Sequence, residues 1–274
     1  MGTAALLNCL IVLLCRVSHG YNVGKNAAPF EPLCGILNVN KPRGITSSDA
    51  CQIVKRIIRD GLRERYPTIV LPRIKVGHGG TLDMHAEGVL AIGVGRATKF
   101  LPFYLQGNKT YEATGVLGYE TDTLDVHGER LKEAPCDHVT DAAFDAALHS
   151  MRGLYEQVPP IYSSKKCRGR RLRDYAIKKI PVEVKPCKVV VYSIERLSRP
   201  SKGLPHFALR VTTSGGTYVR SLIRDMAYKL NTLGTMESLI RVAKCNLSLA
   251  DSLPVHSLDY DTIVRSLRNP TIEQ

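Results

Sequence analysis

A glycine-rich turn at residues 77–83, Gly-His-Gly-Gly-Thr-Leu-Asp, constrains this chain more than any other segment. Three glycines within four positions specify a tight backbone path that few other residues tolerate. The apolar run at residues 89–94 follows closely and is typical of a buried strand. The turn therefore places a single carboxylate, Asp83, just before a buried strand, with no second acid beside it in the sequence. A lone carboxylate in such a place suggests a nucleophile rather than half of an acid–base pair.

The chain is strongly basic, with a net charge of +13 and a pI near 9.4 over 274 residues. A positive field of this size favours polyanions, most often nucleic acid. The excess is concentrated in two segments. Residues 55–75 carry seven Lys or Arg against two acids, and residues 165–179 carry eight against one. Both segments are expected to neutralise phosphates with little sequence preference.

The eight cysteines are scattered and form no C-x-x-C pair, so we expect reduced thiols and no zinc site. Residues 1–30 begin with an apolar stretch that is too short to span a bilayer. This segment is similar to a secretory signal that lacks its basic start. An organelle-targeting sequence and a mis-annotated start are the alternatives.

Strand and helix patterns are mixed irregularly along the chain. Alternating apolar residues predict strands at residues 35–40, 89–94, 111–117, 182–197 and 207–212. Helical spacing predicts helices that start near Thr46 and Thr140 and at residues 96–106 and 218–230. The mixture favours an α+β fold with a mostly antiparallel sheet. We expect one catalytic domain at residues 31–262 and a short tail at residues 263–274.

Five short motifs occur in one order between residues 35 and 253. They are Asn40-Lys41-Pro42-x-Gly44-x-Thr46-Ser47, the 77–83 turn, Ala97-Thr98-Lys99, Lys109-x-Tyr111 and Gly216-Thr217-Tyr218-Val219-Arg220-Ser221-Leu222. Together they resemble the TruB family of RNA pseudouridine synthases. The resemblance implies the pseudouridine synthase fold, a mixed and mostly antiparallel central sheet flanked by helices and loops.

The resemblance also implies a reaction. Asp83 matches the family's catalytic aspartate, which attacks the sugar or the base of a flipped uridine. The N-glycosidic bond is then cleaved and the base is re-attached through carbon. This isomerisation requires neither an organic cofactor nor a metal.

Five further residues match family positions that bind the substrate. Arg220 matches the arginine that pairs with the catalytic aspartate. Tyr111 and Tyr218 match aromatics placed against the flipped uracil, and Tyr111 is the better candidate for proton transfer. The others are His78, which matches a residue that helps to evict the base, and Leu239, which matches an apolar residue of the uracil pocket. Lys41 falls in a motif that supports the site.

The family's usual substrate is the T-loop of tRNA, and mRNA stem-loops are a further possibility. Gly79 points to the eukaryotic TruB-like type, and the short segment after residue 253 predicts no PUA domain. We expect a monomer without a membrane partner. We expect it to act in the nucleus or cytoplasm, or in a mitochondrion, so the signal-like start is interpreted as misleading. The segment Leu239-Ile240-Arg241 lacks one of two adjacent arginines usual in the family, and the basic segment at 165–179 lies near the family's RNA-clasping insertion.

Two other functions are alternatives to this one. A non-catalytic RNA-binding protein or tRNA-folding chaperone could retain the same scaffold, and the altered segment after Leu239 would suit it. Against that, Asp83, Arg220 and both tyrosines are all present. A secreted hydrolase would use Ser163 and Lys166 as an S-x-x-K pair, but the partner motifs of such enzymes are absent from the sequence.

Overall fold

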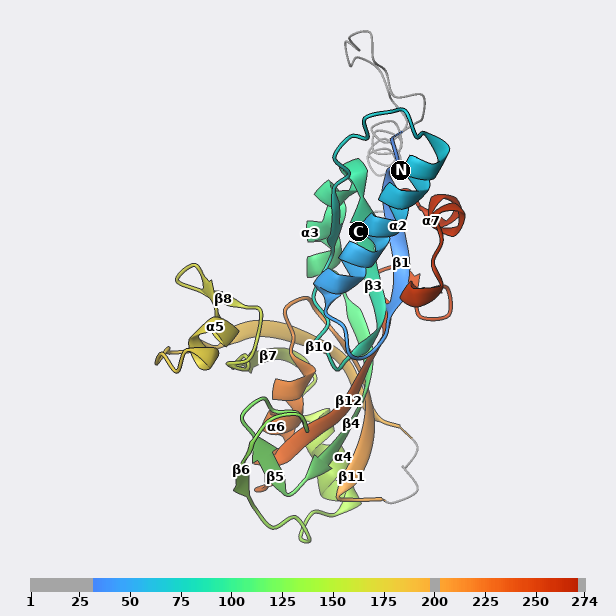
Figure 1. Cartoon of the computed structure of the whole chain (residues 1–274). Helices are drawn as coiled ribbons and strands as arrows, with labels where there is room; N and C mark the ends of the chain where they lie inside the picture. The colour runs from blue at the N-terminus through green and yellow to red at the C-terminus, as the bar shows by residue number, and fades with distance from the viewer. Residues whose placement is uncertain (1–31, 198–202, 271–274) are drawn as a thin grey trace, which may run out of the picture. The chain divides into compact units, whose positions relative to one another are not determined.

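The protein is described here by a computed structural model that covers residues 32–197 and 203–270. Its described residues form two compact units: unit 1 is residues 32–107 with 243–270, and unit 2 is residues 108–197 with 203–242 (Figure 1). The expected catalytic segment at residues 31–262 therefore contributes to both units. Strands pair mostly antiparallel in each unit, and helices cover them. This arrangement confirms the α+β prediction.

Unit 1 is built on strands β1 and β3, which pair antiparallel from Gly35↔Val94 to Lys41↔Gly88. Strand β2 pairs with β3, and β14 pairs parallel with β1. The elements are β1 (Gly35–Lys41), α2 (Ser47–Arg65), β2 (Val76–His78), β3 (Glu87–Val94), the 3-10 helix η1 (Gly95–Phe100), α3 (Leu101–Gln106), β13 (Leu247–Ser248), β14 (Leu253–Pro254), η2 (Val255–Ser257) and α7 (Tyr260–Ser266).

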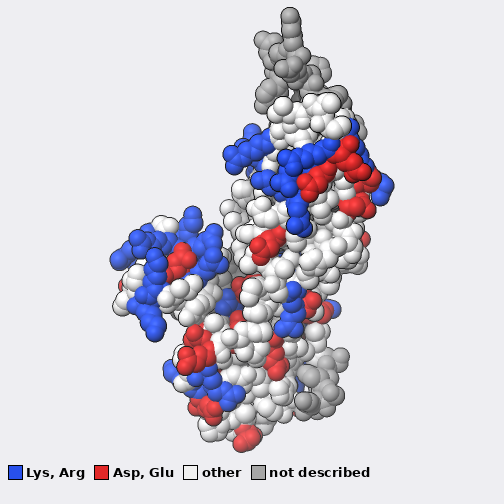
Figure 2. Space-filling view, viewed as in Figure 1, with Lys and Arg blue, Asp and Glu red and all other residues white. Residues whose placement is uncertain are grey.

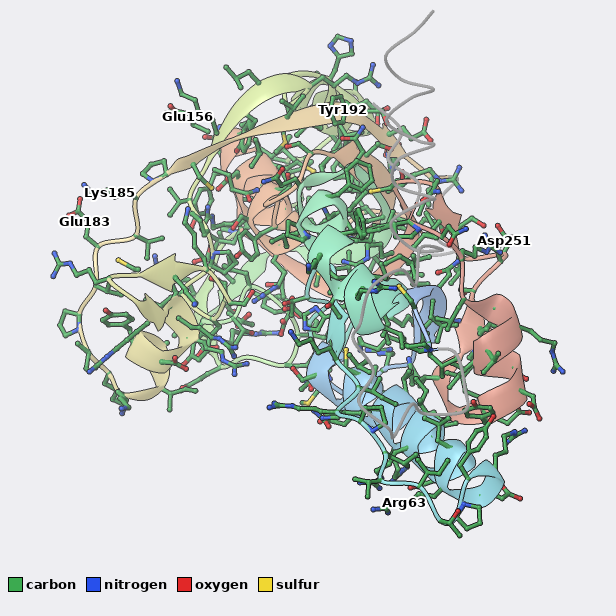
Figure 3. All side chains as sticks on the ribbon, turned by 90° about the horizontal axis from the view of Figure 1, so that it is seen from above. Arg63, Glu156, Glu183, Lys185, Tyr192 and Asp251 are labelled. Atoms are coloured by element: carbon green, nitrogen blue, oxygen red, sulfur yellow. The ribbon has the colours of Figure 1, made fainter. Side chains whose placement is uncertain are left out.

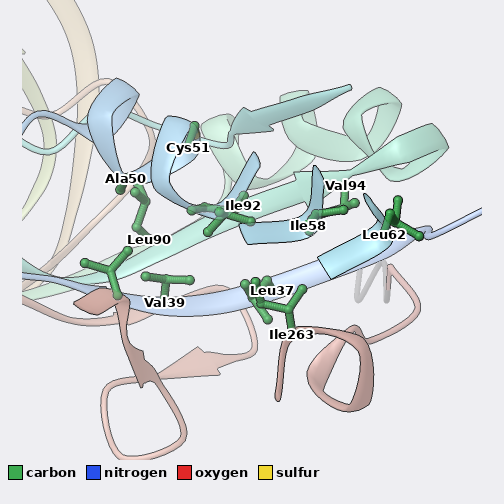
Figure 4. Close-up of a cluster of buried hydrophobic side chains, with 12 residues drawn as sticks. Leu37, Val39, Ala50, Cys51, Ile58, Leu62, Leu90, Ile92, Val94 and Ile263 are labelled. Atoms are coloured by element: carbon green, nitrogen blue, oxygen red, sulfur yellow. The ribbon is translucent and has the colours of Figure 1, made fainter. Parts of the chain in front are cut away.

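Both faces of the β1–β3 pair are buried, in the alternation that a strand imposes. Leu37 and Val39 point to the α2 side and pack with Leu90 and Ile92 of β3 (Figure 4). Ile36, one position earlier than Leu37, belongs to a second cluster on the opposite face, together with residues of η1 and α3. Because helices cover both faces, these strands read as continuous apolar runs in the sequence.

Helix α2 begins where its sequence predicts. Thr46 is the N-cap: its Oγ1 accepts the Asp49 N–H at 3.1 Å, while Asp49 Oδ2 accepts the Thr46 N–H at 2.9 Å. This reciprocal capping box satisfies two backbone donors that a helix start leaves without intrahelical partners. The cap lowers the pKa of Asp49, chiefly through its hydrogen bonds to Thr46. It therefore fixes the point at which the chain leaves the Lys41–Ile45 turn.

Unit 2 contains strands in the order β12, β4, β11, β10, β7. Helices α4 and α6 pack on them. The elements are β4 (Lys109–Leu117), β5 (Tyr119–Thr121), β6 (Arg130–Glu133), α4 (Asp141–His149), β7 (Gly153–Gln157), β8 (Lys166–Cys167), β9 (Arg170–Arg171), α5 (Leu172–Ile177), β10 (Cys187–Arg196), β11 (His206–Thr213), α6 (Val219–Lys229) and β12 (Gly234–Lys244), whose last two residues belong to unit 1.

The core of unit 2 lies between its sheet and the two helices. Phe144 of α4 is fully buried against Phe207 of β11, with ring centroids 5.1 Å apart. Leu222, Ile223 and Met226 give α6 a buried face. The first turn of α6 is thereby held against the sheet at the end that carries Tyr218 and Arg220.

A basic lobe, defined here as residues 163–186, projects from unit 2. It consists of the β8–β9 hairpin, α5 and a return segment on which Glu183 and Lys185 are exposed (Figure 3). Lys and Arg side chains are gathered over it (Figure 2). A cavity of about 470 Å³ opens in the lobe, lined by Lys165, Arg168, Leu172, Tyr175 and Val182 among others. Seven of the eight Lys and Arg side chains at residues 165–179 are exposed, and their expected contact with phosphates stays a prediction.

The structure departs from the predicted elements at the start of one expected strand, at several strands that were not predicted and at the last helix. The strand expected at residues 182–197 begins only at Cys187, because Pro181 and Pro186 cannot donate to a ladder. Strand β12 and the hairpin β5–β6 were missed. Helix α7 continues past residue 262, where we placed the end of the domain. No helix among the described residues is long and apolar enough to cross a membrane.

Candidate active site

The residues predicted for the site are divided between the units. In unit 1, His78 is the last residue of β2 and pairs with Ile92 of β3. Asp83 follows five residues later, in the connection between β2 and β3, and its side chain is half-buried. This connection, residues 79–86, is called the Asp83 loop below.

The glycines of the Asp83 loop are required by its packing. A Cβ on Gly79 would lie 2.6 Å from Cβ of Tyr104, whose side chain is buried in unit 1. Gly80 has φ of +131°, a conformation that L side chains rarely adopt. The N–H of Gly79 donates to the Ala91 carbonyl at 2.9 Å, which fastens the loop to β3. The loop thus has a fixed start.

Lys41 supports the far side of the loop. Its ammonium is fully buried and donates to the carbonyls of Pro42 and Ile45, both at 2.8 Å, and to that of Met84 at 3.4 Å. The Gly44 N–H donates to the same Met84 carbonyl at 2.9 Å. The residue directly after Asp83 is therefore held by two donors of the 41–45 turn. The structural role that the motif implied for Lys41 is seen directly.

Ser47 holds the residue directly before Asp83. Its Oγ donates to the Leu82 carbonyl at 3.1 Å and accepts the Leu82 N–H at 2.8 Å. Both Ser47 and Leu82 are buried. Because Ser47 is the first residue of α2, the capped helix start fixes this hydroxyl. Asp83 is thus clamped on both sides, at Leu82 and at Met84.

This clamp predicts the effect of Ser47→Ala. The substitution leaves both polar groups of Leu82 without their side-chain partner, so we expect the free energy of unfolding to fall by about 1–3 kcal/mol. The carboxylate would then be less precisely placed, and we expect catalysis to slow by roughly 10-fold. Denaturant titration and single-turnover kinetics measure the two effects. Ser252→Ala is the control, because Ser252 Oγ donates to Leu249 and not to the loop; an equal loss of rate in both variants would contradict the clamp.

In unit 2, Arg220 is the second residue of α6 and its side chain is only 4% exposed. Nη1 donates to the Thr123 carbonyl at 2.6 Å, and Nη2 donates to the Tyr162 carbonyl at 3.1 Å. Burial of a guanidinium is tolerated only when its donors are satisfied. The two carbonyls therefore fix the plane of the Arg220 fork.

Asp125 supports Arg220 and was missed in the sequence. Its Oδ2 lies 3.9 Å from Nη1 of Arg220, and its other oxygen accepts the Thr123 hydroxyl at 2.8 Å and the His127 N–H at 3.0 Å. The signal available was the run Thr121-Asp122-Thr123-Leu124-Asp125, two acids among turn residues. No spacing rule links that run to a helix 95 residues later.

The remaining predicted residues also lie in unit 2. Tyr218 is the N-cap residue of α6, two positions before Arg220. Tyr111 on β4 and Leu239 on β12 are buried, with 6% and 8% exposure. Their strands are neighbours in the sheet, and the Thr114 and Ser238 hydroxyls join them at 2.7 Å. The unit therefore assembles the residues predicted to contact uracil and the predicted partner of the aspartate.

Within the described parts of the chain, no group of three or more His, Cys, Asp or Glu side chains is arranged to hold a metal ion. Acids do gather on unit 2 around a recess of about 480 Å³ lined by Glu120, Asp122 and Asp225. Those three acids already bond Tyr228, the Glu129 backbone and Tyr155.

Comparison with known proteins decides the family. Residues 69–219 match the TruB family pseudouridylate synthase (N terminal domain). The tRNA pseudouridine synthase B of Caldanaerobacter subterraneus is 35% identical, over 87% of this chain and 80% of that protein. The pseudouridylate synthase TRUB1 of Mus musculus is 37% identical, over 89% and 73%.

This chain belongs to the TruB family. A solved structure, that of a Cbf5-Nop10-Gar1 complex, matches with a TM-score of 0.54 at 27% identity. The match covers 77% of this chain, which spans about half (48%) of that chain. The resemblance predicted from five motifs is confirmed, and so is the expectation of a pseudouridine synthase, an isomerase.

Membership of the TruB family does not by itself test the individual site residues. Asp83 and His78 belong to unit 1, whereas Tyr111, Tyr218, Arg220 and Leu239 belong to unit 2. The pairing of Asp83 with Arg220 and the contacts with uracil therefore stay predictions. Of the motif roles, the support of the Asp83 loop by Lys41 is visible within one unit.

Proposed function

We propose that this TruB-family protein is a tRNA pseudouridine synthase that isomerises the uridine at the bend of the T-loop. Asp83 attacks the sugar or base of the flipped uridine, and the N-glycosidic bond breaks. The same base is then re-attached through carbon as the bond to Asp83 breaks, and the proton lost from that carbon is balanced by one gained at the freed ring nitrogen. Product and substrate have the same atoms, so the reaction needs no co-reactant. The observation that carries this proposal is the clamped Asp83 loop, which holds one carboxylate between two fixed residues.

Arg220 is proposed to orient the Asp83 carboxylate and to favour its ionised form. An arginine beside an acid stabilises the charged carboxylate. Support comes from its fixed geometry: two carbonyls and Asp125 hold the guanidinium before any substrate arrives. A preorganised partner has no reorganisation cost during the reaction.

Tyr218, Tyr111, Leu239 and His78 are proposed to receive the uracil. Base flipping requires a platform that replaces the stacking lost in the RNA, and aromatic side chains provide one. Tyr111 is also the proposed proton-transfer group, and His78 helps to evict the base. Support comes from burial: Tyr111 is buried and Tyr218 is half-buried, as a water-poor pocket requires.

RNA is proposed to be held through phosphates by the basic lobe and by the exposed face of α2. Arg56, Arg59 and Arg63 are exposed along α2, and Arg168, Arg170 and Arg171 are exposed on the lobe. Exposed cations of this kind neutralise phosphates and release counterions. Recognition would then depend on the shape of a folded loop more than on base edges. Suitable mRNA stem-loops would be accepted for the same reason.

The lobe makes a quantitative prediction. In Arg170→Gln/Arg171→Gln, we expect the slope of log Kd against log salt to fall by about 1.4–1.8, since each of the two lost phosphate contacts removes roughly 0.7–0.9. Filter binding of tRNA at several salt concentrations measures the slope. Lys132→Gln/Lys229→Gln removes the same charge from exposed positions of unit 2 outside the lobe. Equal slopes for the two double variants would show that the basic lobe is not part of the RNA interface.

Three further points belong to the proposal. Gly79 supports the eukaryotic TruB-like type, and the mouse relative is of similar identity to the bacterial ones. The protein is proposed to act as a monomer on RNA in the nucleus, cytoplasm or mitochondrion. The apolar start at residues 1–30 lies outside the described residues.

The direct test uses the purified full chain and an unmodified tRNA transcript. Site-resolved pseudouridine mapping is expected to find the product at the T-loop uridine. Product at another uridine alone would overturn the substrate. RNA binding without product at any position would favour the alternative of a non-catalytic RNA-binding protein or folding chaperone.

A further inference from the structure

The nitrogen and the oxygen of the Gln157 side-chain amide both bond the backbone of one residue, Tyr218. Gln157 is the last residue of β7 and is fully buried. Nε2 donates to the Tyr218 carbonyl at 3.0 Å, and Oε1 accepts the Tyr218 N–H at 2.8 Å. A side-chain amide bonded to both backbone groups of one residue imitates a neighbouring strand. It restrains rotation of the backbone on either side of Tyr218.

Tyr218 stands where such a restraint is needed. It is the N-cap of α6, with extended backbone at φ −109° and ψ 111°. Tyrosine cannot cap a helix with its own side chain in the manner of Ser, Thr, Asp or Asn. The turn before it contains Gly216 at φ +85°, and the Thr217 hydroxyl donates to the Ser214 carbonyl at 3.0 Å within it. Without Gln157, the N–H and the carbonyl of Tyr218 would each lose the bond that Gln157 makes, and the carbonyl would keep the one it accepts from the Leu222 N–H at 3.1 Å.

Neighbouring contacts hold the body of the helix, and the Leu222 N–H within α6 also donates to the Tyr218 carbonyl at 3.1 Å. Ser221 Oγ donates to the Val158 carbonyl at 2.8 Å, and Tyr155 Oη donates to Asp225 Oδ2 at 2.8 Å. Burial and Asp225 raise the pKa of Tyr155, so this donor stays protonated at physiological pH. These bonds lie one and two turns into α6. Gln157 bonds both peptide groups of Tyr218 itself, its N–H and its carbonyl.

We propose that Gln157 is the positioning residue for Tyr218: it fixes the backbone from which the aromatic ring is presented to the flipped uracil. The inference rests on the proposed function, because it gives Gln157 a role in uridine isomerisation. This role of Gln157 requires a planar side-chain group with one hydrogen-bond donor and one acceptor side by side. Glu supplies only the acceptor when ionised, and Met supplies neither.

The first test is kinetic. Gln157→Met keeps a similar volume and removes both bonds. We expect the single-turnover rate at saturating tRNA to fall by roughly 10- to 100-fold because the Tyr218 ring is misplaced. The Kd for tRNA should change less than about threefold, because phosphate contacts dominate binding. Thr235→Val is the control: it removes a buried bond of similar kind, from Thr235 Oγ1 to the Tyr119 carbonyl at 2.7 Å. Its rate is expected to match the wild type.

The second test separates positioning from mere stability. In a Tyr218→Leu background, Gln157→Met is expected to change the rate by less than about twofold, because the ring that Gln157 positions is already gone. Fully additive losses in the double variant would show a structural role and overturn the inference. A full wild-type rate in Gln157→Met alone would overturn it as well.

The third test uses pH. In Gln157→Glu, burial raises the pKa of the new carboxyl. Below that pKa, the O–H of the acid donates to the Tyr218 carbonyl, as the amide N–H did. Above it, an oxygen of the carboxylate faces the Tyr218 carbonyl oxygen with no proton between them. The variant's rate relative to the wild type is therefore expected to fall as pH rises, and a ratio independent of pH would contradict the inference. Absence of product from the wild type on any RNA would instead refute the proposed function itself.

Discussion

Asp83→Asn is expected to abolish pseudouridine formation while tRNA binding persists. The amide is almost the same size as the carboxylate but is no nucleophile, so we expect the single-turnover rate to fall by at least ~10⁴-fold. Binding depends on phosphate contacts elsewhere, and we expect Kd for tRNA to stay within about threefold of the wild type. Rapid-quench assays and filter binding measure the two quantities.

The loop geometry makes this variant a clean one. The residues on either side of Asp83 are held through their backbone groups, Met84 by Lys41 and Leu82 by Ser47. The substitution alters none of these groups. The unfolding midpoint should therefore match that of the wild type. Measurable turnover by Asp83→Asn would show that another group is the nucleophile and would overturn the assignment.

Replacing Arg220 is expected to have the second largest effect. Arg220→Lys keeps the charge, but a single ammonium cannot reproduce the planar fork that bonds the Thr123 and Tyr162 carbonyls. If Arg220 orients the Asp83 carboxylate, the rate should fall by roughly 10²- to 10³-fold. Arg220→Met should also lose about 3–5 kcal/mol of unfolding free energy, because Asp125 is left without its cation.

Arg196→Lys is the matched control for Arg220→Lys. Arg196 is another mostly buried arginine of unit 2 and bonds an aspartate, Asp141, at 2.6 Å. Its replacement should cost stability but leave the rate of isomerisation near that of the wild type. A similar fall in rate for both lysine variants would mean that Arg220 acts only on the stability of unit 2.

Local signals in the sequence predicted much of the fold. Thr46 with Asp49 marked the start of α2, and Thr140 marked that of α4. Alternating apolar residues located β1, β3, β4 and β11 to within two residues. These features depend on neighbours in the chain, so a sequence window contains the information.

Features that depend on distant partners were not predictable in this way. Gln157 contacts Tyr218 across 61 positions, and Ser47 contacts Leu82 across 35. Nothing near Gln157 in the sequence distinguishes it from a solvated glutamine at a strand end. The candidate residues other than Leu239 came from five motifs in a fixed order, whereas the groups that hold them became visible only in the fold.

Mapping pseudouridine in cellular RNA, with and without this protein, tests the central claim most directly. Cells that lack the protein should lose the modification at the T-loop uridine of its tRNA substrates. Re-expression of the wild type should restore it, and re-expression of Asp83→Asn should not. An unchanged map in cells that lack the protein, or full restoration by Asp83→Asn, would contradict the account.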